Sequence, residues 1–287
     1  LGRSRPNVWS GLPHFASEFC TDCGQGVQLM DGSFVFIVVV QLMPDWESND
    51  HSKPKPCCNN SVVAYVSKDG HSWRYTSPVA PYNSSRYNGM EGPNECALVL
   101  LRDNRTLFAV MRIDGGDGSD GGIKPLLSAT STDGGFSWHE APLPVDMLAA
   151  QPRAVVLANG ALLVTAGRPG VDLFVSADGF GRSWQRYSLP TFHNRLVDVQ
   201  HESHEWKFCM AYEKAAANHT FQDDPRRGWT QSDGYNAIAA VGYDTALVCY
   251  DRMGVSQGPF NNMNLPCWTQ RRNYTECSSI PWPHGWG

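Results

Sequence analysis

The sequence has little charge and no cluster of Lys or Arg. Lys, Arg, Asp and Glu make up 18% of its 287 residues, and the formal net charge at pH 7 is −5. Proteins that bind nucleic acids through the phosphate backbone need a basic surface. The composition therefore argues against nucleic acid as a partner.

Long hydrophobic runs are also missing. The longest strictly apolar run spans residues 34–40, whereas a membrane helix needs about 20 apolar residues. No transmembrane segment is expected, and the β-branched content of the run predicts a buried strand. The sequence lacks an initiator Met and a signal peptide at Leu1, so we expect a processed chain or a fragment.

Glycine, proline and tryptophan are plentiful. The chain has 27 Gly, 19 Pro and 10 Trp, which is typical of many short strands joined by tight turns. Its length suits one large all-β domain, because barrels and propellers often exceed the usual domain size. Composition thus favours an all-β fold.

One short pattern occurs three times. It reads SKDGHSW at residues 67–73, STDGGFSW at residues 131–138 and SADGFGRSW at residues 176–184. In this repeated turn the Ser and Asp side chains can bond nearby backbone groups, Gly supplies positive φ, and Trp starts the next strand as a large buried anchor. Three copies predict a repeated structural unit.

Strand patterns surround the repeated turns at the spacing of four-stranded blades, which are about 40 to 50 residues long. The expected strands are 26–30, 33–41 and 61–66; then 97–101, 106–112 and 125–130; then 154–157, 161–168 and 171–175; then 236–241 and 245–250. Residues 44–60 are expected to form a loop. After about residue 255 little strand pattern remains.

Two arginines follow apolar strands in this pattern. Arg112 and Arg168 lie the same number of residues after the turn residues Asn104 and Gly160, which predicts equivalent positions in adjacent repeats. Two guanidinium groups that converge are suited to a carboxylate or a phosphate. The alternative is that each arginine ends a strand at the surface or pairs with a neighbouring carboxylate.

Five Asn-x-Ser/Thr sequons and nine cysteines favour a secretory-pathway glycoprotein. The sequons are at Asn59, Asn83, Asn104, Asn218 and Asn273. The odd number of cysteines leaves one free or bonded elsewhere. Cys20 and Cys23 have the spacing of half a zinc site or a redox motif, but without a second such pair a disulfide or a purely structural role is favoured. Loop cysteines such as Cys267 and Cys277 suggest further disulfides, whose connectivity the sequence does not give.

Several segments resemble sialidases. The repeated turn resembles the Asp-box, or BNR repeat, of that family. Residues 24–32 resemble the glycine-rich strand of a middle blade, and residues 94–100 resemble the Glu-bearing strand. Arg112 resembles the second arginine of the family's triad, and residues 167–170 resemble the segment of the third. Residues 234–238 resemble the nucleophile segment, and residues 249–251 resemble the Leu-Tyr-Glu that follows it. The resemblance implies a six-bladed sialidase-type β-propeller, of which about four blades lie in this sequence, near 24–75, 92–140, 152–186 and 233–252. Residues 1–254 would form this partial propeller, and 255–287 a Cys/Pro/Asn-rich C-terminal segment.

The resemblance also implies a function. It indicates a retaining exo-sialidase that hydrolyses terminal sialic acid from glycoconjugates. Tyr235 would be the nucleophile and Glu95 the group that takes its proton. Arg112 and Arg168 would bind the sugar carboxylate, and Asp251 would orient or balance a guanidinium. No metal or cofactor is implied, the partners are sialylated glycans, and the location is the exterior, the secretory pathway or a lysosome-like compartment.

The sequence departs from the family at its start. It contains no Arg-Ile-Pro, the motif that carries the first triad arginine, so we expect an N-terminally incomplete member without that Arg or the general acid Asp. Two substitutes stay open, namely Asp45 or Asp50 as the acid and Arg153 as the arginine. A different class of function also stays open, a glycan-binding or receptor-type propeller without catalysis. Glu91 competes with Glu95, which is preferred because it precedes the apolar strand directly.

Overall fold

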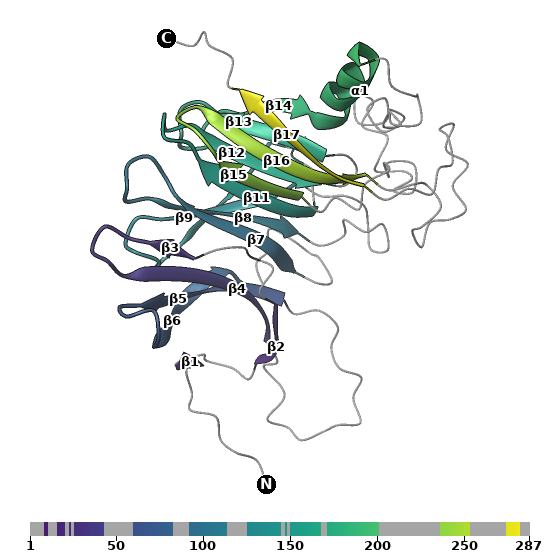
Figure 1. The fold of residues 1–287 in the computed structure, drawn as a ribbon. Coiled ribbons are helices and arrows are strands. Elements are labelled where there is room, and N and C mark those ends of the chain that lie inside the picture. Colours follow the sequence, from purple (N-terminus) through teal and green to yellow (C-terminus); the bar gives the residue numbers. More distant parts are fainter. Residues whose placement is uncertain are drawn as a thin grey trace, which may run out of the picture. The chain divides into compact units, whose positions relative to one another are not determined.

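The structure is a computed structural model, and it describes residues 9–10, 16–20, 23, 26–42, 60–82, 92–113, 125–144, 147, 150–167, 171–200, 236–252 and 274–281. These residues form strands and one α-helix (Figure 1). The chain divides into two compact units. Unit 1 comprises Leu1–Asp114 and Leu127–Leu143, and unit 2 comprises Gly115–Leu126 and Pro144–Gly287. No helix in these described segments is long and apolar enough to cross a membrane.

The first sheet of unit 1 is built around β4, which begins with a continuous apolar run rich in β-branched residues. Its strands are β1 (Trp9–Ser10), β2 (Ala16–Cys20), β3 (Val27–Gln28), β4 (Phe34–Leu42), β5 (Asn60–Ser67) and β6 (Trp73–Ala80). Their order is β1-β6-β5-β4-β2, and β3 also pairs with β4. The β1–β6 pair is parallel and the other pairs are antiparallel.

The second sheet of unit 1 is an antiparallel meander. Its strands are β7 (Pro93–Leu100), β8 (Leu107–Ile113), β9 (Leu127–Ser131) and β10 (His139–Pro142), in the order β10-β9-β8-β7. β7 is therefore an edge strand. A core of buried side chains joins the two sheets, including Ile37, Ala64, Leu98 and Met111.

Unit 2 repeats this plan. One sheet contains β11 (Ala150–Val156), β12 (Leu162–Gly167), β13 (Val171–Ser176) and β14 (Gln185–Ser188), and the other contains β15 (Asn236–Ala240), β16 (Thr245–Arg252) and β17 (Tyr274–Pro281). Buried residues such as Leu163, Leu173 and Val248 form their shared core. The predicted all-β class is confirmed, with four sheets in the described residues, and the number of blades stays a prediction.

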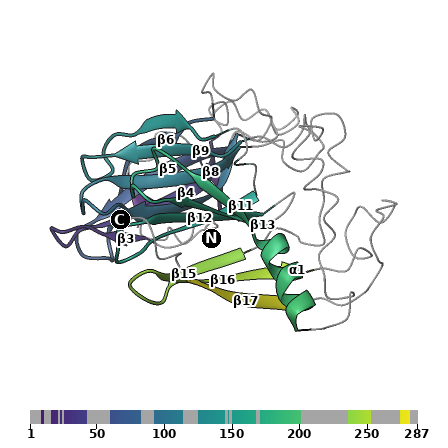
Figure 2. The same cartoon turned by 90° about the horizontal axis from the view of Figure 1, so that it is seen from above.

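Helix α1 (Leu189–Val199) follows β14 directly. Ser188 is its N-cap, because the Ser188 hydroxyl accepts a hydrogen bond from the amide of Thr191. The helix lies against the sheet of β15, β16 and β17 (Figure 2), where Nδ1 of buried His193 is 3.1 Å from the hydroxyl of buried Tyr250. The sequence pattern did not predict this helix.

The repeated turns have the hydrogen bonds that their composition predicts. In the first, the amides of Ser72 and His71 donate to one carboxylate oxygen of Asp69, and the amide of Gly70 donates to the hydroxyl of Ser67. The hydrogen bonds from Ser72, His71 and Ser67 lower the pKa of Asp69 to about 2. Such an aspartate is ionised at any physiological pH and is occupied by its own turn, which agrees with a role in folding.

The second and third turns repeat this geometry. Asp133 accepts from the amides of Phe136 and Ser137, and Asp178 accepts from the amides of Phe180 and Ser183. Burial acts to raise the pKa of Asp133, but these hydrogen bonds outweigh it and lower the pKa to about 2. The three Trp side chains that close the turns are half-buried, so the expectation of large buried anchors is met only in part.

The C-terminal segment differs from expectation as well. β17 lies within residues 255–287 and pairs antiparallel with β16 from Thr245↔Pro281 to Arg252↔Tyr274. The expectation of little strand structure after residue 255 is wrong for these eight residues. A partner strand, which no local pattern reveals, decides their conformation. The predicted domain boundary at residue 254 stays a prediction.

Candidate active site

Glu95 lies in a β-bulge near the start of β7. Asn94 pairs with Arg112 of β8, and Cys96 pairs with Met111, which is the neighbour of Arg112. Two steps along β7 therefore match one step along β8, and Glu95 is the extra residue. Bulges re-aim side chains and often lie beside functional sites. This bulge sets two polar residues of β7, Asn94 and Glu95, opposite the single residue Arg112.

Glu95 and Arg112 form a buried ion pair. Nη1 of Arg112 donates to Oε2 of Glu95 at 3.1 Å, and the two side chains are 5% and 13% exposed for Arg112 and Glu95, respectively. A guanidinium group this deeply buried destabilises a protein unless its charge is matched. Pairing with a neighbouring carboxylate was one of the two readings of Arg112 from sequence. A guanidinium has five N–H donors, so the same group can hold one carboxylate and still bind another.

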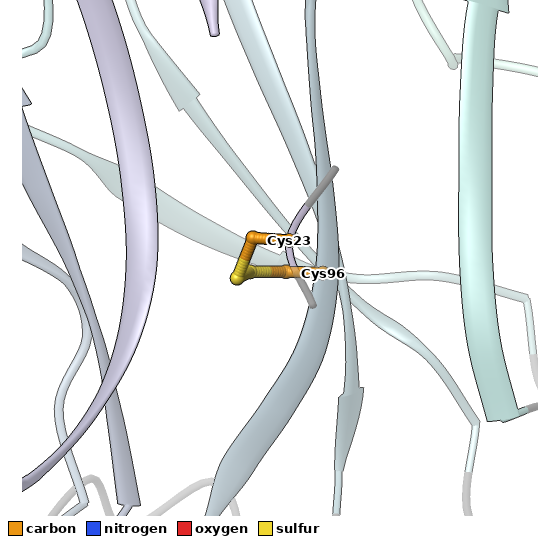
Figure 3. Close-up of a disulfide and its surroundings, with 2 residues drawn as sticks. All are labelled: Cys23 and Cys96. Carbon is orange, nitrogen blue, oxygen red and sulfur yellow. A yellow bond between two sulfur atoms is a disulfide. The ribbon is translucent and has the colours of Figure 1, made fainter. Parts of the chain in front are cut away.

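A disulfide bond lies directly beside this pair. Cys96, the residue after Glu95, is bonded to Cys23 (Figure 3), and both side chains are buried in the core of unit 1. Cys23 lies in a turn before β3 of the first sheet, so the bond links this turn to β7 of the second sheet. The expectation of a disulfide for Cys23 is confirmed. Its partner was not predictable from spacing, because 73 positions separate the two cysteines.

The other predicted site residues belong to unit 2. Arg168 and Tyr235 lie outside the described residues, directly after β12 ends at Gly167 and directly before β15 begins at Asn236. Asp251 lies in β16 opposite Thr275 of β17, and its side chain is outside the described part. The roles of these three residues stay predictions.

A buried hydrogen-bond network joins three strands next to these positions. The hydroxyl of Thr165 in β12 donates to Oδ1 of Asn236 in β15 at 2.5 Å, and Nδ2 of Asn236 donates to the carbonyl of Gln151 in β11 at 3.2 Å. Gln151 has a φ of +43°, in the left-handed region, at an irregularity in the β11–β12 ladder. The network fixes the strand ends adjoining Arg168 and Tyr235. Asn236 was part of the segment 234–238 singled out from sequence but received no role there, although a polar residue that opens an apolar strand was a usable signal.

The register of the sheets corrects one inference from sequence. Ser131 and Ser176 open the second and third repeated turns, and they pair with Leu107 and Leu162. Counted from these two leucines, Arg112 is level with Gly167, and Arg168 comes one residue later. The reason is the hairpin length, since Leu101 and Thr106 close a turn with four residues between them, whereas Leu157 and Ala161 close one with three.

Of the residues that could replace the missing triad arginine and general acid, the structure describes only Arg153. Arg153 lies in β11, is half-buried and pairs with Thr165. Asp45, Asp50 and Glu91 lie outside the described residues. Within the described segments no cluster of three or more His, Cys, Asp or Glu could hold a metal ion.

Comparison with known proteins gives a likeness of fold. No protein-family model matches the chain. No curated protein matches it. Among solved structures, a protein of unknown function from Dyadobacter fermentans is 15% identical, with a TM-score of 0.53 over 89% of this chain and 52% of that one. A family 117 glycoside hydrolase from Zobellia galactanivorans is 10% identical, with a TM-score of 0.51 over 90% of this chain and 65% of that enzyme.

Sialidases occur among the similar structures. The Trypanosoma rangeli sialidase in complex with the inhibitor DANA is 13% identical, with a TM-score of 0.46 over 83% of this chain and 30% of that one. The similarity of fold is shown by the Dyadobacter fermentans protein and the Zobellia galactanivorans enzyme, which have the higher TM-scores. This chain therefore shares its fold with a glycoside hydrolase, and it spans about half to two thirds of the length of those two proteins.

Proposed function

We propose that this chain belongs to a retaining exo-sialidase that hydrolyses terminal sialic acid from glycoconjugates. The observation that supports this most directly is the buried Glu95–Arg112 pair, which joins the two residues of unit 1 that the sialidase resemblance had singled out. The resemblance, which covers segments in the family order from residue 24 to about 252, supplies the roles. The fold shared with a glycoside hydrolase agrees with the reaction class.

The chemistry follows from the substrate. Sialic acid carries a carboxylate next to its anomeric carbon, so a carboxylate nucleophile would be repelled, whereas a neutral phenol would not. In the first step the Tyr235 oxygen bonds to the anomeric carbon, the glycosidic C–O bond breaks with retention of its electron pair on oxygen, and Glu95 takes the phenol proton. The departing oxygen takes a proton from solvent. Water then displaces the Tyr235 oxygen from the anomeric carbon and releases one proton to solvent, and the proton held by Glu95 returns to the phenolate.

Arg112 and Arg168 would bind the sugar carboxylate in this scheme, and Asp251 would balance a guanidinium charge. A fork of N–H donors binds a carboxylate through two parallel hydrogen bonds. Arg112 already holds one carboxylate, that of Glu95. The proposal places the proton acceptor and the substrate anchor within hydrogen-bond distance of each other, which keeps both fixed relative to the reacting atoms.

The first test uses a sialoside with a fluorescent aryl leaving group, which departs without strong acid assistance. Tyr235→Phe in the full chain should lower kcat by about a thousandfold or more, because the variant cannot form the covalent intermediate. Tyr243→Phe is the matched control, since Tyr243 is an exposed tyrosine in the β15–β16 turn. Equal activity in the Tyr235 variant and the control would refute the nucleophile assignment.

A second class of function, a glycan-binding propeller without catalysis, is favoured by the missing Arg-Ile-Pro motif. It predicts binding of sialosides without turnover. Incubation with a fluorinated sialic acid analogue, followed by mass spectrometry of tryptic peptides, separates the two. A covalent adduct on Tyr235 supports the hydrolase, and saturable binding with no adduct and no turnover supports the binding protein.

A further inference from the structure

We propose that the Cys23–Cys96 disulfide positions Glu95 for catalysis, so that full activity requires this bond. The inference rests on the function proposed above and adds two residues that the family resemblance does not assign. In β7, the strand that carries Glu95, backbone hydrogen bonding is weak at the point where the Glu95 side chain must be held in place.

Three features weaken the hold on this end of β7. β7 is the edge strand of its sheet and pairs with β8 alone among the described strands. Its first residue is Pro93, which has no N–H to donate to a ladder. The bulge then makes Glu95 the extra residue, so the ladder is interrupted between Asn94 and Cys96.

The disulfide supplies the missing constraint one residue away. The side chains of Cys96 and Met111, which are paired across the ladder, both enter the core of unit 1. Met111 and Arg112 are adjacent residues of β8 and point to opposite faces. Glu95 contacts Arg112, whereas Cys96 enters the core with Met111, so a fixed Cys96 limits how far the backbone of Glu95 can move on the other face. Figure 3 shows Cys23 on a short segment beside the strand of Cys96, and the covalent bond ties the two together.

Arg112 is held differently. It lies in β8, and the residue before it, Met111, is paired on both sides, with Cys96 of β7 and with Leu127 of β9. Loss of the disulfide should therefore displace Glu95 more than Arg112. In the proposed reaction Arg112 binds the substrate carboxylate and Glu95 moves the proton. A displaced Glu95 should therefore change kcat, and a displaced Arg112 should change KM.

The test is the double variant Cys23→Ala/Cys96→Ala in the full chain, compared with the wild type and with Leu107→Ala. Leu107 is fully buried in the same core but starts β8 at its other end, away from Glu95. The control thus loses core packing without disturbing the bulge. A misplacement of about 1 Å can lower a rate by about a hundredfold. We expect kcat of the double variant to fall tenfold to a hundredfold, KM to change less than threefold, and Leu107→Ala to keep kcat within threefold at a temperature where all three proteins are folded.

Two results would overturn the inference. In the first, kcat of the double variant equals kcat of Leu107→Ala. In the second, both variants show a lower kcat and a higher KM to the same extent, which would indicate general loosening of the core. Treatment of the wild type with dithiothreitol should reproduce the double variant, and an unchanged kcat after demonstrated reduction of this bond would also contradict it.

Failure of the proposed function is recognised separately, because it would leave the wild type without turnover. The inference is then tested by hydrogen–deuterium exchange. Peptides covering residues 93–96 should lose protection in the double variant and keep it in Leu107→Ala, while residues 110–113 of β8 stay protected in the double variant. Unchanged protection at 93–96 would overturn the role of the disulfide independently of any activity.

Discussion

The Glu95–Arg112 pair should show a strong energetic coupling in a double-mutant cycle. The perturbations are Glu95→Gln, Arg112→Met and the two together, each of which keeps the approximate side-chain volume. At 3.1 Å and an effective dielectric constant of about 20, the Coulomb attraction between unit charges is about 5 kcal/mol. Desolvation of both groups offsets much of this, so the pair itself adds little to stability.

Removal of one partner is a different matter, because it leaves a buried charge without its counterion. Glu95→Gln would leave the guanidinium of Arg112 in a site that is 5% exposed, and such changes cost about 3 to 5 kcal/mol. Arg112→Met should cost about 2 to 3 kcal/mol, because the more exposed Glu95 can reach water. The double variant should lose only about 1 kcal/mol, which gives a coupling energy of about 4 to 7 kcal/mol.

The assay is urea unfolding at pH 7, followed by tryptophan fluorescence, with the transition of unit 1 identified by its response to a core variant of that unit. Arg105→Met is the control, since Arg105 is an exposed arginine in the β7–β8 turn, and it should change stability by less than about 0.5 kcal/mol. Additive effects, with a coupling below about 0.5 kcal/mol, would refute the reasoning that the two charges depend on each other.

Further predictions concern the repeated turns and unit 2. The pKa of Asp69 is about 2 in the folded chain and near 3.8 when unfolded, so its stabilisation is fully present above pH 4 and is lost as the pH falls through 2. Asp69→Asn should therefore lower the urea midpoint at pH 7 and have a much smaller effect near pH 2. Thr165→Val should destabilise unit 2 by about 1 to 3 kcal/mol, because the buried Asn236 carbonyl loses a donor, and Thr165→Ser should restore most of this in the same assay. Gly135→Ala should lower the melting temperature, since φ is +90° and the added Cβ would lie 3.1 Å from Val35; an unchanged value would contradict the strain.

Local patterns predicted most strands of this fold because the relevant information is local. The run that forms β4 is continuously apolar over residues 34–40 and rich in β-branched residues, and each repeated turn carries its own hydrogen-bond donors and acceptors. The same turns fix the ladder, since Ser67, Ser131 and Ser176 pair with the first residue of the preceding strand. Counting residues from the partners of these serines would have made Arg112 equivalent to Gly167, as the sheets have it. A count from the hairpin turns failed because the hairpins differ in length.

Features that depend on distant partners were not predictable. β17 is a strand because β16 offers it a ladder, and Cys23 meets Cys96 because two sheets pack together. Nine cysteines allow many pairings, and nothing in the spacing of these two selects one. Helix α1 did have local signals, an N-cap at Ser188 followed by proline in the first turn, and these could have been read. Of the site, the choice of Glu95 and Arg112 came from the sequence, and their mutual contact needed the structure.

The burial of Arg112 bears on why this pair exists. In unit 2, Arg186 contacts Asp172 at 3.0 Å, but its side chain is 26% exposed, so much of its charge stays hydrated. Arg112 has no comparable access to water. Apolar residues can replace such a buried pair without loss of stability, so a need for stability does not explain it. A buried guanidinium held by a carboxylate on a bulged edge strand agrees with the role proposed for Arg112 as the anchor of an anionic substrate, since the low local dielectric that makes the charge expensive also strengthens its attraction for an anion.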